Sequence, residues 1–374
     1  MKFQTQSLKP YLSRLQRSLP GKPVSRAAGA LWFRPEGSAL AIAAFQGDTS
    51  YVCRIPAQCS PGDTLGTIDG SRALAVFAKL PDGDADMEIN TETGKILLKQ
   101  DRRRFTLSGI DASWAPEIPG PLSAPDNVDG PALIESIKFA ASSTFTDVRM
   151  YGPLACVLIK KSPDGLHTVG LNGAQLSMAR SRAGWDNLDG QILLPGHYVS
   201  LLSACLAKGI WACAILDGSM HMQSADMLQY LTIPLHNDTY PDYQPLIDIQ
   251  HTTSLAVDKA SVLDTLSRLQ IFRGTDIHSF SLDVTSQGAT AEINSEEGFA
   301  QEFLPGSMDG DPVCIRLHLD SFASLLSALP GSGRVHIRMT GPAGLCAVSM
   351  EGDDSMIAVT MPVTTIQQEE SDVL

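Results

Sequence analysis

The sequence lacks the cysteine patterns that mark metal centres and disulfide-rich folds. Its seven cysteines are odd in number and form no Cys-x-x-Cys pair, whereas zinc sites and disulfide frameworks show paired spacings or an even count. The eight histidines are dispersed, and none lies at metal-ligand spacing from another. We therefore expect no metal or cofactor, and we expect reduced thiols in the hydrophobic core. The cysteines are Cys53, Cys59, Cys156, Cys205, Cys213, Cys314 and Cys346.

A long hydrophobic run is also missing. The most apolar stretch, residues 192–216, is interrupted by Pro195, Lys208 and Gly209, whereas a membrane-spanning helix needs about 20 mostly apolar residues. The amino-terminal residues turn polar at once and contain no apolar segment of the signal-peptide kind. A composition of 43% hydrophobic and 18% charged residues is that of a folded globular protein. These features predict a cytoplasmic protein that does not cross a membrane.

Motifs of the common enzyme classes are absent. The sequence contains no G-x-x-x-x-G-K-[ST] loop, no G-x-G-x-x-G, no G-x-S-x-G and no H-E-x-x-H. The acidic residues 82–86 begin like a calcium loop, but Met87 stands where the sharp turn needs glycine and Thr93 where a closing glutamate belongs. We therefore predict a protein without a catalytic site. A hydrolase or transferase whose residues converge only in the folded chain is the alternative.

Positive charge is scarce. The chain has 28 basic and 41 acidic residues, which gives a net charge of -13. A protein that binds a polyanion such as DNA must neutralise phosphates with lysine and arginine. The overall balance therefore argues against a nucleic-acid partner, unless the basic residues gather on one surface.

The sequence does contain a long repeat. A helical pattern of apolar residues begins near Leu8, Leu133 and Lys259, at intervals of 125 and 126 residues. The strand–turn–strand patterns that follow are centred on glycines at similar intervals, and each copy then shows a second helix and alternating β-rich sequence. The glycines are Gly37, Gly165 and Gly288, and the second helices are expected at residues 71–80, 196–208 and 319–329.

Proline-rich or polar segments join the copies, as linkers do. We predict three α+β domains, each with two helices packed on antiparallel sheets, followed by a short acidic tail. Their predicted limits are residues 1–122, 123–247, 248–366 and 367–374.

The six predicted helices reverse the charge balance of the chain. They contain nine basic and four acidic residues, which indicates a basic lining for a nucleic-acid channel. Solvated helix faces that happen to favour lysine and arginine are the alternative explanation. The windows are residues 7–19, 71–80, 131–144, 196–208, 258–272 and 319–329.

Candidate phosphate contacts come from these helices and from nearby turns. The run Arg102-Arg103-Arg104 is a further candidate of the same kind. The DNA-binding candidates are Lys9, Arg14, Arg17, Lys22, Arg26, Arg72, Lys79, Lys138, Arg149, Lys208 and Arg268.

Several local sequences resemble one family when they are taken in order. From Met1 to about Val363, the chain resembles the bacterial DNA polymerase III β subunit, the replicative sliding clamp, as a divergent member. The segments that support the resemblance are Met1-Lys2-Phe3, Arg103-Arg104-Phe105-Thr106-Leu107, Thr239-Tyr240-Pro241-Asp242-Tyr243, Phe272-Arg273-Gly274 and Met361-Pro362-Val363.

The resemblance implies a homodimeric ring of six domains, with helices lining the hole. Such a ring encircles duplex DNA without reading its sequence and tethers a DNA polymerase as a processivity factor. A clamp-fold scaffold or regulator that does not encircle DNA is the alternative.

The resemblance also implies a pocket for short peptides of the polymerase and the clamp loader. The family's T-D-G-H-R-L is Leu171-Asn172-Gly173-Ala174-Gln175-Leu176 here, and a family arginine is Pro245. The pocket rim therefore loses basic residues, and partner preference is expected to differ. The matching pocket positions are Leu154, Leu171, Gly173, Leu176, Pro241, Leu246, Val359, Met361, Pro362 and Val363.

Overall fold

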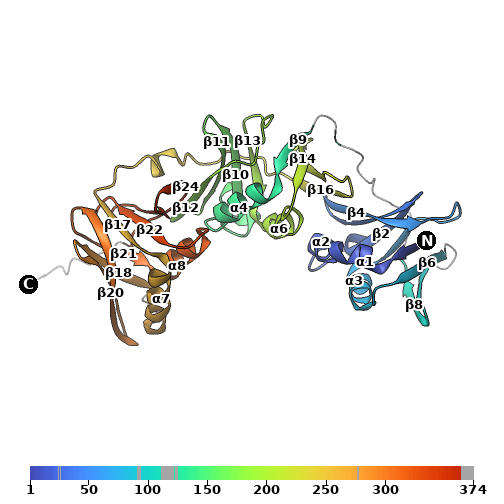
Figure 1. Ribbon diagram of the computed structural model, residues 1–374, viewed down its shortest axis with the longest axis horizontal. Helices are drawn as coiled ribbons and strands as arrows, with labels where there is room; N and C mark the ends of the chain where they lie inside the picture. Colours follow the sequence, from blue (N-terminus) through green and yellow to red (C-terminus); the bar gives the residue numbers. More distant parts are fainter. Residues whose placement is uncertain are drawn as a thin grey trace, which may run out of the picture. The chain divides into compact units, whose positions relative to one another are not determined.

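The computed structural model describes residues 1–23, 25, 27–90, 94–110, 122, 125–275 and 278–363 (Figure 1). Arg26, Thr93 and the predicted acidic tail lie outside these residues. The contacts group the chain into two compact units. Unit 1 comprises Met1–Ile134, Arg182–Asp189 and His197–Asn237, and unit 2 comprises Glu135–Ser181, Gly190–Gly196 and the chain from Asp238 onward.

Unit 1 is built on one sheet whose longest path runs β8-β7-β6-β1-β4-β16-β15-β14-β9, with β2, β3 and β5 branching from it. Its strands are β1 (Lys2–Gln4), β2 (Ala30–Glu36), β3 (Ala39–Gln46), β4 (Thr49–Gln58), β5 (Gly66–Asp69), β6 (Asp84–Asn90), β7 (Lys95–Gln100), β8 (Arg103–Ser108), β9 (Asp126–Asp129), β14 (Ile210–Leu216), β15 (Ser219–Ser224) and β16 (Gln229–Pro234).

The helices of unit 1 pack their apolar residues against this sheet. Asp69 caps α3 by accepting a hydrogen bond from the backbone N–H of Arg72, and Phe77 of the same helix meets the rings of Phe3 and Phe33. The helical segments of unit 1 are α1 (Thr5–Leu8), η1 (Lys9–Tyr11), α2 (Leu12–Ser18), η2 (Ala27–Gly29), α3 (Gly70–Lys79) and α6 (Val199–Cys205). Two further segments contain a boundary between the units: α4 (Gly130–Ala141) begins in unit 1 and ends in unit 2, and η4 (Gly196–Tyr198) begins in unit 2 and ends in unit 1.

Unit 2 is built on a second antiparallel sheet with the order β13-β10-β11-β12-β24-β23-β22-β17-β20-β19-β18-β21. Its strands are β10 (Cys156–Ser162), β11 (Gly165–Leu171), β12 (Gln175–Ser181), β13 (Gln191–Pro195), β17 (Thr253–Asp258), β18 (Ser279–Thr285), β19 (Gly288–Ser295), β20 (Gly298–Gly310), β21 (Val313–His318), β22 (Arg334–Met339), β23 (Cys346–Met350) and β24 (Asp353–Thr360).

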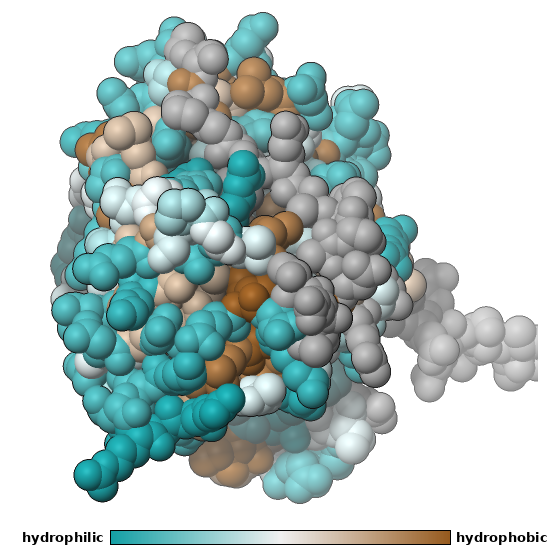
Figure 2. Space-filling view, turned by 90° about the vertical axis from the view of Figure 1, so that its right-hand side faces the viewer, coloured by the Kyte–Doolittle hydropathy of each residue, from teal (hydrophilic) through white to brown (hydrophobic). Residues whose placement is uncertain are grey.

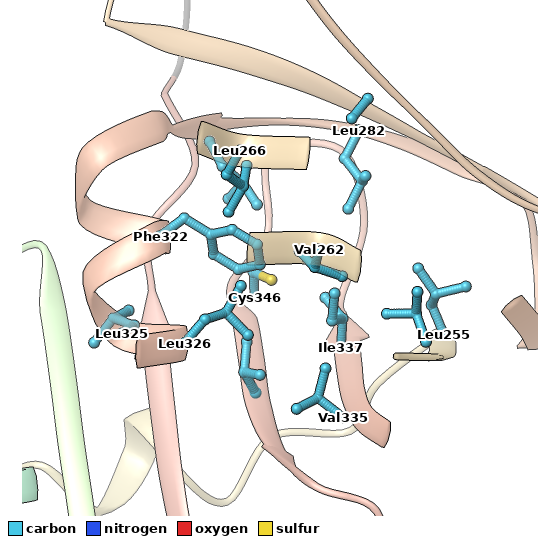
Figure 3. Packing of buried hydrophobic residues seen from close by; sticks show 14 of the residues in the cluster. Leu255, Val262, Leu266, Leu282, Phe322, Leu325, Leu326, Val335, Ile337 and Cys346 are labelled. Carbon is cyan, nitrogen blue, oxygen red and sulfur yellow. The ribbon is translucent and has the colours of Figure 1, made fainter. Parts of the chain in front are cut away.

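Two helices and the sheet enclose the largest core of unit 2. Figure 3 shows Leu266 of one helix and Phe322 of the other pointing toward Ile337 on the sheet, and all three side chains are buried. Apolar residues at helical spacing produce this packing because they place one face of each helix on the strands. The helical segments of unit 2 are α5 (Val148–Tyr151), η3 (Gly152–Ala155), η5 (Gln244–Leu246), α7 (Lys259–Leu269), η6 (Gln270–Phe272) and α8 (Leu319–Ala328).

The predicted repeat is present in the order of these elements. A strand, a helical segment, four strands, a helix and three strands recur three times along the described chain, beginning at β1, β9 and β17. Strands of the middle repeat join both sheets, since β14 to β16 continue the sheet of unit 1 and β10 to β13 that of unit 2. The predicted domain limits at residues 122 and 247 stay a prediction.

Two sequence-based expectations were wrong. The first helix is not continuous over residues 7–19, because η1 interrupts it where Pro10 has no N–H to donate to the preceding turn. Cys314 is exposed and Cys59 is half-buried, whereas Cys53, Cys156, Cys205, Cys213 and Cys346 are buried free thiols as predicted.

Gly170 of β11 is tightly enclosed, and alanine there should destabilise unit 2. An added Cβ would lie 1.8 Å from the carbonyl oxygen of Ala140, so backbone must move, at a cost of about 1–3 kcal/mol. A lower urea midpoint, with faster hydrogen exchange in unit 2, is the expected result. Gly62→Ala is the control because no atom lies within 4 Å of its added Cβ. Equal midpoints for the two variants would contradict the prediction.

Candidate functional site

The predicted phosphate contacts divide into exposed residues without an ion-paired carboxylate and residues that are half-buried or paired with a carboxylate. In unit 1, Arg17 on α2 and both Arg72 and Lys79 on α3 are exposed, as are Lys22 and Lys208 in turns. In unit 2, Lys138 on α4 and Arg149 on α5 are exposed. None of these seven forms an ion pair with a carboxylate in the part of the chain that the structure describes. They are the residues best placed to attract an anion.

Arg14 is engaged within unit 1, although it lies only one turn before Arg17. Its Nε donates to the carbonyl oxygen of Ala204 at 2.8 Å, and its Nη1 donates to Oε1 of Gln229 at 2.6 Å. The same Gln229 oxygen accepts a hydrogen bond of 2.9 Å from the hydroxyl of buried Tyr51. Arg14 therefore joins α2 to α6 and to β16, and we exclude it from the proposed DNA contacts.

Two other predicted contacts are neutralised by carboxylates. Lys9 forms an ion pair with Asp82. Arg268 makes a two-pronged contact with Glu302, with 2.6 Å from Nε to Oε1 and from Nη2 to Oε2. The hydrogen bond from Arg268 lowers the pKa of Glu302. The carboxylate is therefore charged at neutral pH and neutralises the charge of the guanidinium. Both residues are weaker candidates for phosphate than the sequence indicated.

Half of the ten predicted peptide-pocket residues gather in one apolar cluster of unit 2. Leu171, Leu176 and Val359 are buried in it, while Leu154 and Leu246 pack against it half-buried. Register explains the meeting, because β12 pairs antiparallel with β24 and sets Leu176 opposite Val359. The cluster also contains residues that the sequence reasoning did not select. Strand alternation predicts the burial of those on strands, but not that of the two tyrosines, which lie between β16 and η5. The residues not selected are Cys156, Leu158, Val169, Met178, Leu193, Tyr240, Tyr243, Ala347 and Ile357.

The remaining pocket positions lie at the surface beside this cluster. Met361 is 52% exposed and Val363 is 38% exposed, and the backbone N–H of Met361 donates to the carbonyl oxygen of Ala174 at 2.9 Å. Gly173 occupies the turn before β12 with φ +85, a conformation that favours glycine. Pro241 is exposed and Pro362 is half-buried. Apolar side chains therefore reach solvent next to a buried apolar floor, which is how peptide anchors are bound.

Several of the described strands have an unpaired edge, and two of these edges carry exposed charged or apolar side chains that could contact another chain. β8 is the end strand of its sheet and carries Arg103 and Arg104, so these arginines lie on an edge and not on a helix. In unit 2 the first half of β20 pairs with β19 alone, while the second half pairs with β17. Phe299 and Phe303 on that half are 53% and 57% exposed. Unpaired edges with apolar side chains are surfaces that can pair with another chain.

The side of the molecule that carries β6 and β8 in Figure 1 faces the viewer in Figure 2. It is mainly hydrophilic, with hydrophobic side chains exposed in a central group and at the lower edge. Such apolar groups on a polar surface are typical of faces that contact another protein.

Metal-binding clusters and reactive thiols are the groups that the alternative of an enzyme would need. Within the described residues, no three His, Cys, Asp or Glu side chains are placed to hold a metal ion. Burial raises the pKa of the Cys156, Cys205 and Cys346 thiols to about 12, so these thiols are protonated at neutral pH. No helix among the described residues is long and apolar enough to cross a membrane.

Replacing Arg14 should reduce stability more than replacing Arg72. Arg14→Ala leaves acceptors of Ala204 and Gln229 without a charged donor, at a cost of about 1.5–3 kcal/mol. Arg72 is exposed on α3, and Arg72→Ala should change the free energy of unfolding by less than about 0.5 kcal/mol. Thermal unfolding of both variants measures the difference. A loss of stability for Arg72→Ala as large as that for Arg14→Ala would contradict the assignment.

Comparison with known proteins gives one consistent group. No family model matches the sequence. The beta sliding clamp of Vibrio cholerae is 23% identical over 365 residues, which cover 95% of this chain and 97% of that protein. A sliding clamp (DNA polymerase III subunit beta) of Pseudomonas aeruginosa bound to griselimycin has a TM-score of 0.89 at 19% identity, over 98% of this chain and 99% of that one. The DNA polymerase III beta subunit of Thermotoga maritima has a TM-score of 0.88 at 15% identity, over 97% and 99%. The predicted α+β clamp fold is thereby confirmed, and the chain is a divergent relative of the bacterial β sliding clamps over almost its whole length.

Proposed function

We propose that this chain is a DNA sliding clamp, a homodimeric ring that encircles duplex DNA and tethers a DNA polymerase as its processivity factor. The observation that carries the proposal is the match to sliding clamps in both sequence and fold over 95% or more of the chain. A partial match would leave room for another assembly. A match of this extent retains every repeat that a closed ring requires.

Seven exposed basic residues, five in unit 1 and two in unit 2, are the proposed DNA contacts. Lysine and arginine attract phosphate without reading bases, and contacts of this kind position a duplex in a sequence-independent way. The acidic chain does not prevent this, because these cations are not paired with carboxylates among the described residues. Retention comes from ring closure, so individual contacts can stay weak enough for sliding. The proposed residues are Arg17, Lys22, Arg72, Lys79, Lys138, Arg149 and Lys208.

Two of the unpaired strand edges, those of β8 and of the first half of β20, supply the proposed contact between copies. β8 presents Arg104 and also Arg103, which pairs with Asp101 at 3.3 Å. The turn into β20 presents Glu297 and also Glu296, which accepts hydrogen bonds from Thr275. Opposite charges steer such edges together, and antiparallel pairing would satisfy their backbone groups. The phenyl ring of Phe303 would gain apolar contact at the same time. One edge lies in each unit of the chain, so two head-to-tail contacts close a dimer.

The apolar cluster around Leu176 and Val359 is the proposed docking site for short peptides of the polymerase and the clamp loader. Exposed Met361 and Val363 would grip the apolar anchors of such a peptide above the buried floor. At the rim, the Nε2 of Gln175 donates to the carbonyl oxygen of Ser321 at 3.0 Å. An uncharged rim that is already hydrogen-bonded would favour peptides whose binding relies on apolar anchors more than on acidic residues.

The proposed protein acts in the cytoplasm, without a cofactor and without catalysis of its own. Its contribution to replication is topological, since it keeps an enzyme near the DNA that it encloses. No reacting group is needed for that task, and the protonated buried thiols are poor nucleophiles.

Topology provides the test of the ring. Protein bound to nicked circular plasmid is treated with a bifunctional crosslinker and passed through a sizing column in high salt. We expect the wild-type chain, at about twice 40.0 kDa, to stay on the circle and to be released when the plasmid is linearised. Phe303→Asp should give a monomer that is not retained, because it places a charge in the proposed contact.

The control for the ring test is Leu216→Asp, which alters an exposed leucine on β14 and should leave both mass and retention unchanged. Equal retention on circular and linear DNA would contradict encirclement. If the wild-type protein is a dimer but is retained on neither circular nor linear DNA, the result would favour a clamp-fold scaffold that does not encircle DNA.

Griselimycin, which is bound to the Pseudomonas aeruginosa clamp, is a suitable probe of the peptide site. Met361→Ala should weaken its binding about tenfold, the loss expected for a well-packed anchor contact. Met227→Ala is the matched control, since Met227 is also an exposed methionine, at 60%, but belongs to unit 1. Isothermal titration measures both. Unchanged affinity in the Met361 variant would show that the cluster is not the binding site.

A further inference from the structure

Unit 1 contains a small cavity lined by polar and apolar side chains, and one of its lining residues is Arg17 of the proposed DNA contacts. Its volume is about 300 Å³. It lies where α2, the turn between β3 and β4, and the segment from η4 into α6 meet. The lining residues are Arg17, Ser18, Gln46, Thr49, His197, Tyr198, Ser200 and Leu201.

Arg17 brings the positive charge to this cavity. Its Nη1 donates to the carbonyl oxygen of Ser200 at 3.2 Å and also to the Ser200 hydroxyl oxygen, and its Nε lies 3.4 Å from the hydroxyl of Ser13. All of these partners are neutral, and no described carboxylate forms an ion pair with Arg17. The guanidinium is therefore held in place while its charge remains uncompensated. The Ser200 hydroxyl accepts from Arg17, which leaves its own hydrogen available to donate.

A buried hydroxyl pair forms another wall. The side chain of Thr49 is buried, at 2% exposure, and its Oγ1 donates to the phenolic oxygen of Tyr198 at 2.7 Å. Because the phenol accepts this bond, its own hydrogen is free to point into the cavity. The arrangement fixes one donor at the wall.

His197 completes the set of donors. Its ring is 4.0 Å from that of Tyr198 between centroids, and burial lowers the pKa of its imidazole. A neutral imidazole retains one N–H donor. The amide of Gln46 can donate as well. The lining thus combines one full positive charge with several neutral donors, and it contains no carboxylate.

We propose that this cavity binds one phosphate group of the DNA backbone. Phosphate offers several acceptor oxygens on one compact group, and a guanidinium with neighbouring hydroxyls is the donor set that proteins use for it. The inference rests on the proposed sliding-clamp function, and it adds the neutral residues Tyr198, Ser200 and His197 to a surface otherwise defined by charge. Exposed Arg72 and Lys79 on α3 belong to the same unit and would meet neighbouring phosphates.

Asp48 gives the proposal a test that does not depend on losing a function. This residue lies in the turn between β3 and β4, next to Thr49 of the cavity wall. Burial raises the pKa of Tyr198, and the nearby charge of Asp48 adds to this effect. Asp48→Asn should strengthen binding of a short duplex at low salt by about twofold or more, because like charges nearby weaken anion binding.

The main experiment is a double-mutant cycle with a short labelled duplex, measured by fluorescence anisotropy over a range of salt. Arg17→Gln should weaken binding and lower the salt slope by about 1. Tyr198→Phe should weaken binding about twofold to tenfold, the worth of one neutral hydrogen bond, and leave the slope unchanged. The two effects should not add, since both residues hold the same phosphate.

Lys79→Gln is the reference variant. It should also lower the salt slope, but its effect should add to that of Tyr198→Phe, because Lys79 contacts another phosphate. The proposal would be overturned if the effects of Arg17→Gln and Tyr198→Phe on duplex affinity were additive. It would also be overturned if Asp48→Asn did not bind the duplex more tightly than the wild type. Thermal unfolding of Tyr198→Phe shows whether the variant is folded, and Asp48→Asn, at an exposed turn position, decides the question if it is not.

Inorganic phosphate alone distinguishes the source of the ligand. Titration at constant ionic strength should give only weak binding, in the millimolar range or above. Saturation at micromolar phosphate, with no effect of Tyr198→Phe on the duplex, would identify a free-anion site and overturn the DNA assignment. Wild-type retention on circular plasmid with no effect of any cavity variant would leave the sliding clamp intact and refute the cavity. Loss of retention with cavity effects still present would refute the ring alone.

Discussion

Backbone pairing between strands of different repeats is the constraint on which the candidate sites depend. In unit 1, β16 pairs with β4, and in unit 2, β12 pairs with β24. Each pairing continues a sheet from one repeat into the next, so the hydrogen-bonded register fixes which side chains meet. The first pairing brings α2 beside α6, where Arg14 and Arg17 find their partners. The second sets Leu176 opposite Val359 and so creates the floor of the peptide site.

The repeat itself could be predicted because its signals are local. Helical spacing of apolar residues, a glycine at each hairpin and alternation in the strands act within about 20 residues, and each recurs in every copy. The prediction of a continuous first helix relied on apolar spacing and neglected Pro10, although this proline is itself a local signal for the interruption. The pocket positions Leu171, Leu176 and Val359 could be located through short motifs, although their meeting depends on strand register. The buried tyrosines of the same cluster, Tyr240 and Tyr243, had no such signal, because they lie in the irregular segment between β16 and η5, where neither helical nor strand periodicity applies.

The roles of the basic residues could not be predicted, because they depend on partners far along the chain. Lys9 pairs with Asp82, and Arg268 pairs with Glu302. The residues of each pair are far apart in the sequence, so neither composition nor local spacing predicts the ion pair. Arg14 and Arg17 illustrate the limit most clearly. They share a helix, a residue type and neutral hydrogen-bond partners. Arg14 is half-buried against Gln229 and Ala204, whereas Arg17 is exposed and can reach a ligand. A count of charges on predicted helices therefore indicates a basic surface without identifying its members.

The same electrostatic logic governs how copies would associate in the proposed ring. Pairing β8 with a second β8 would set Arg103 and Arg104 against arginines, and pairing the β20 edges would gather Glu296 and Glu297. Like charges opposite one another destabilise both arrangements. Only β8 against β20 combines opposite signs, so contact between identical edges is disfavoured and contact between different edges is favoured. A heterologous contact of this kind can close into a ring. Charges on two strand edges would thus direct assembly toward the closed form that retention on DNA requires.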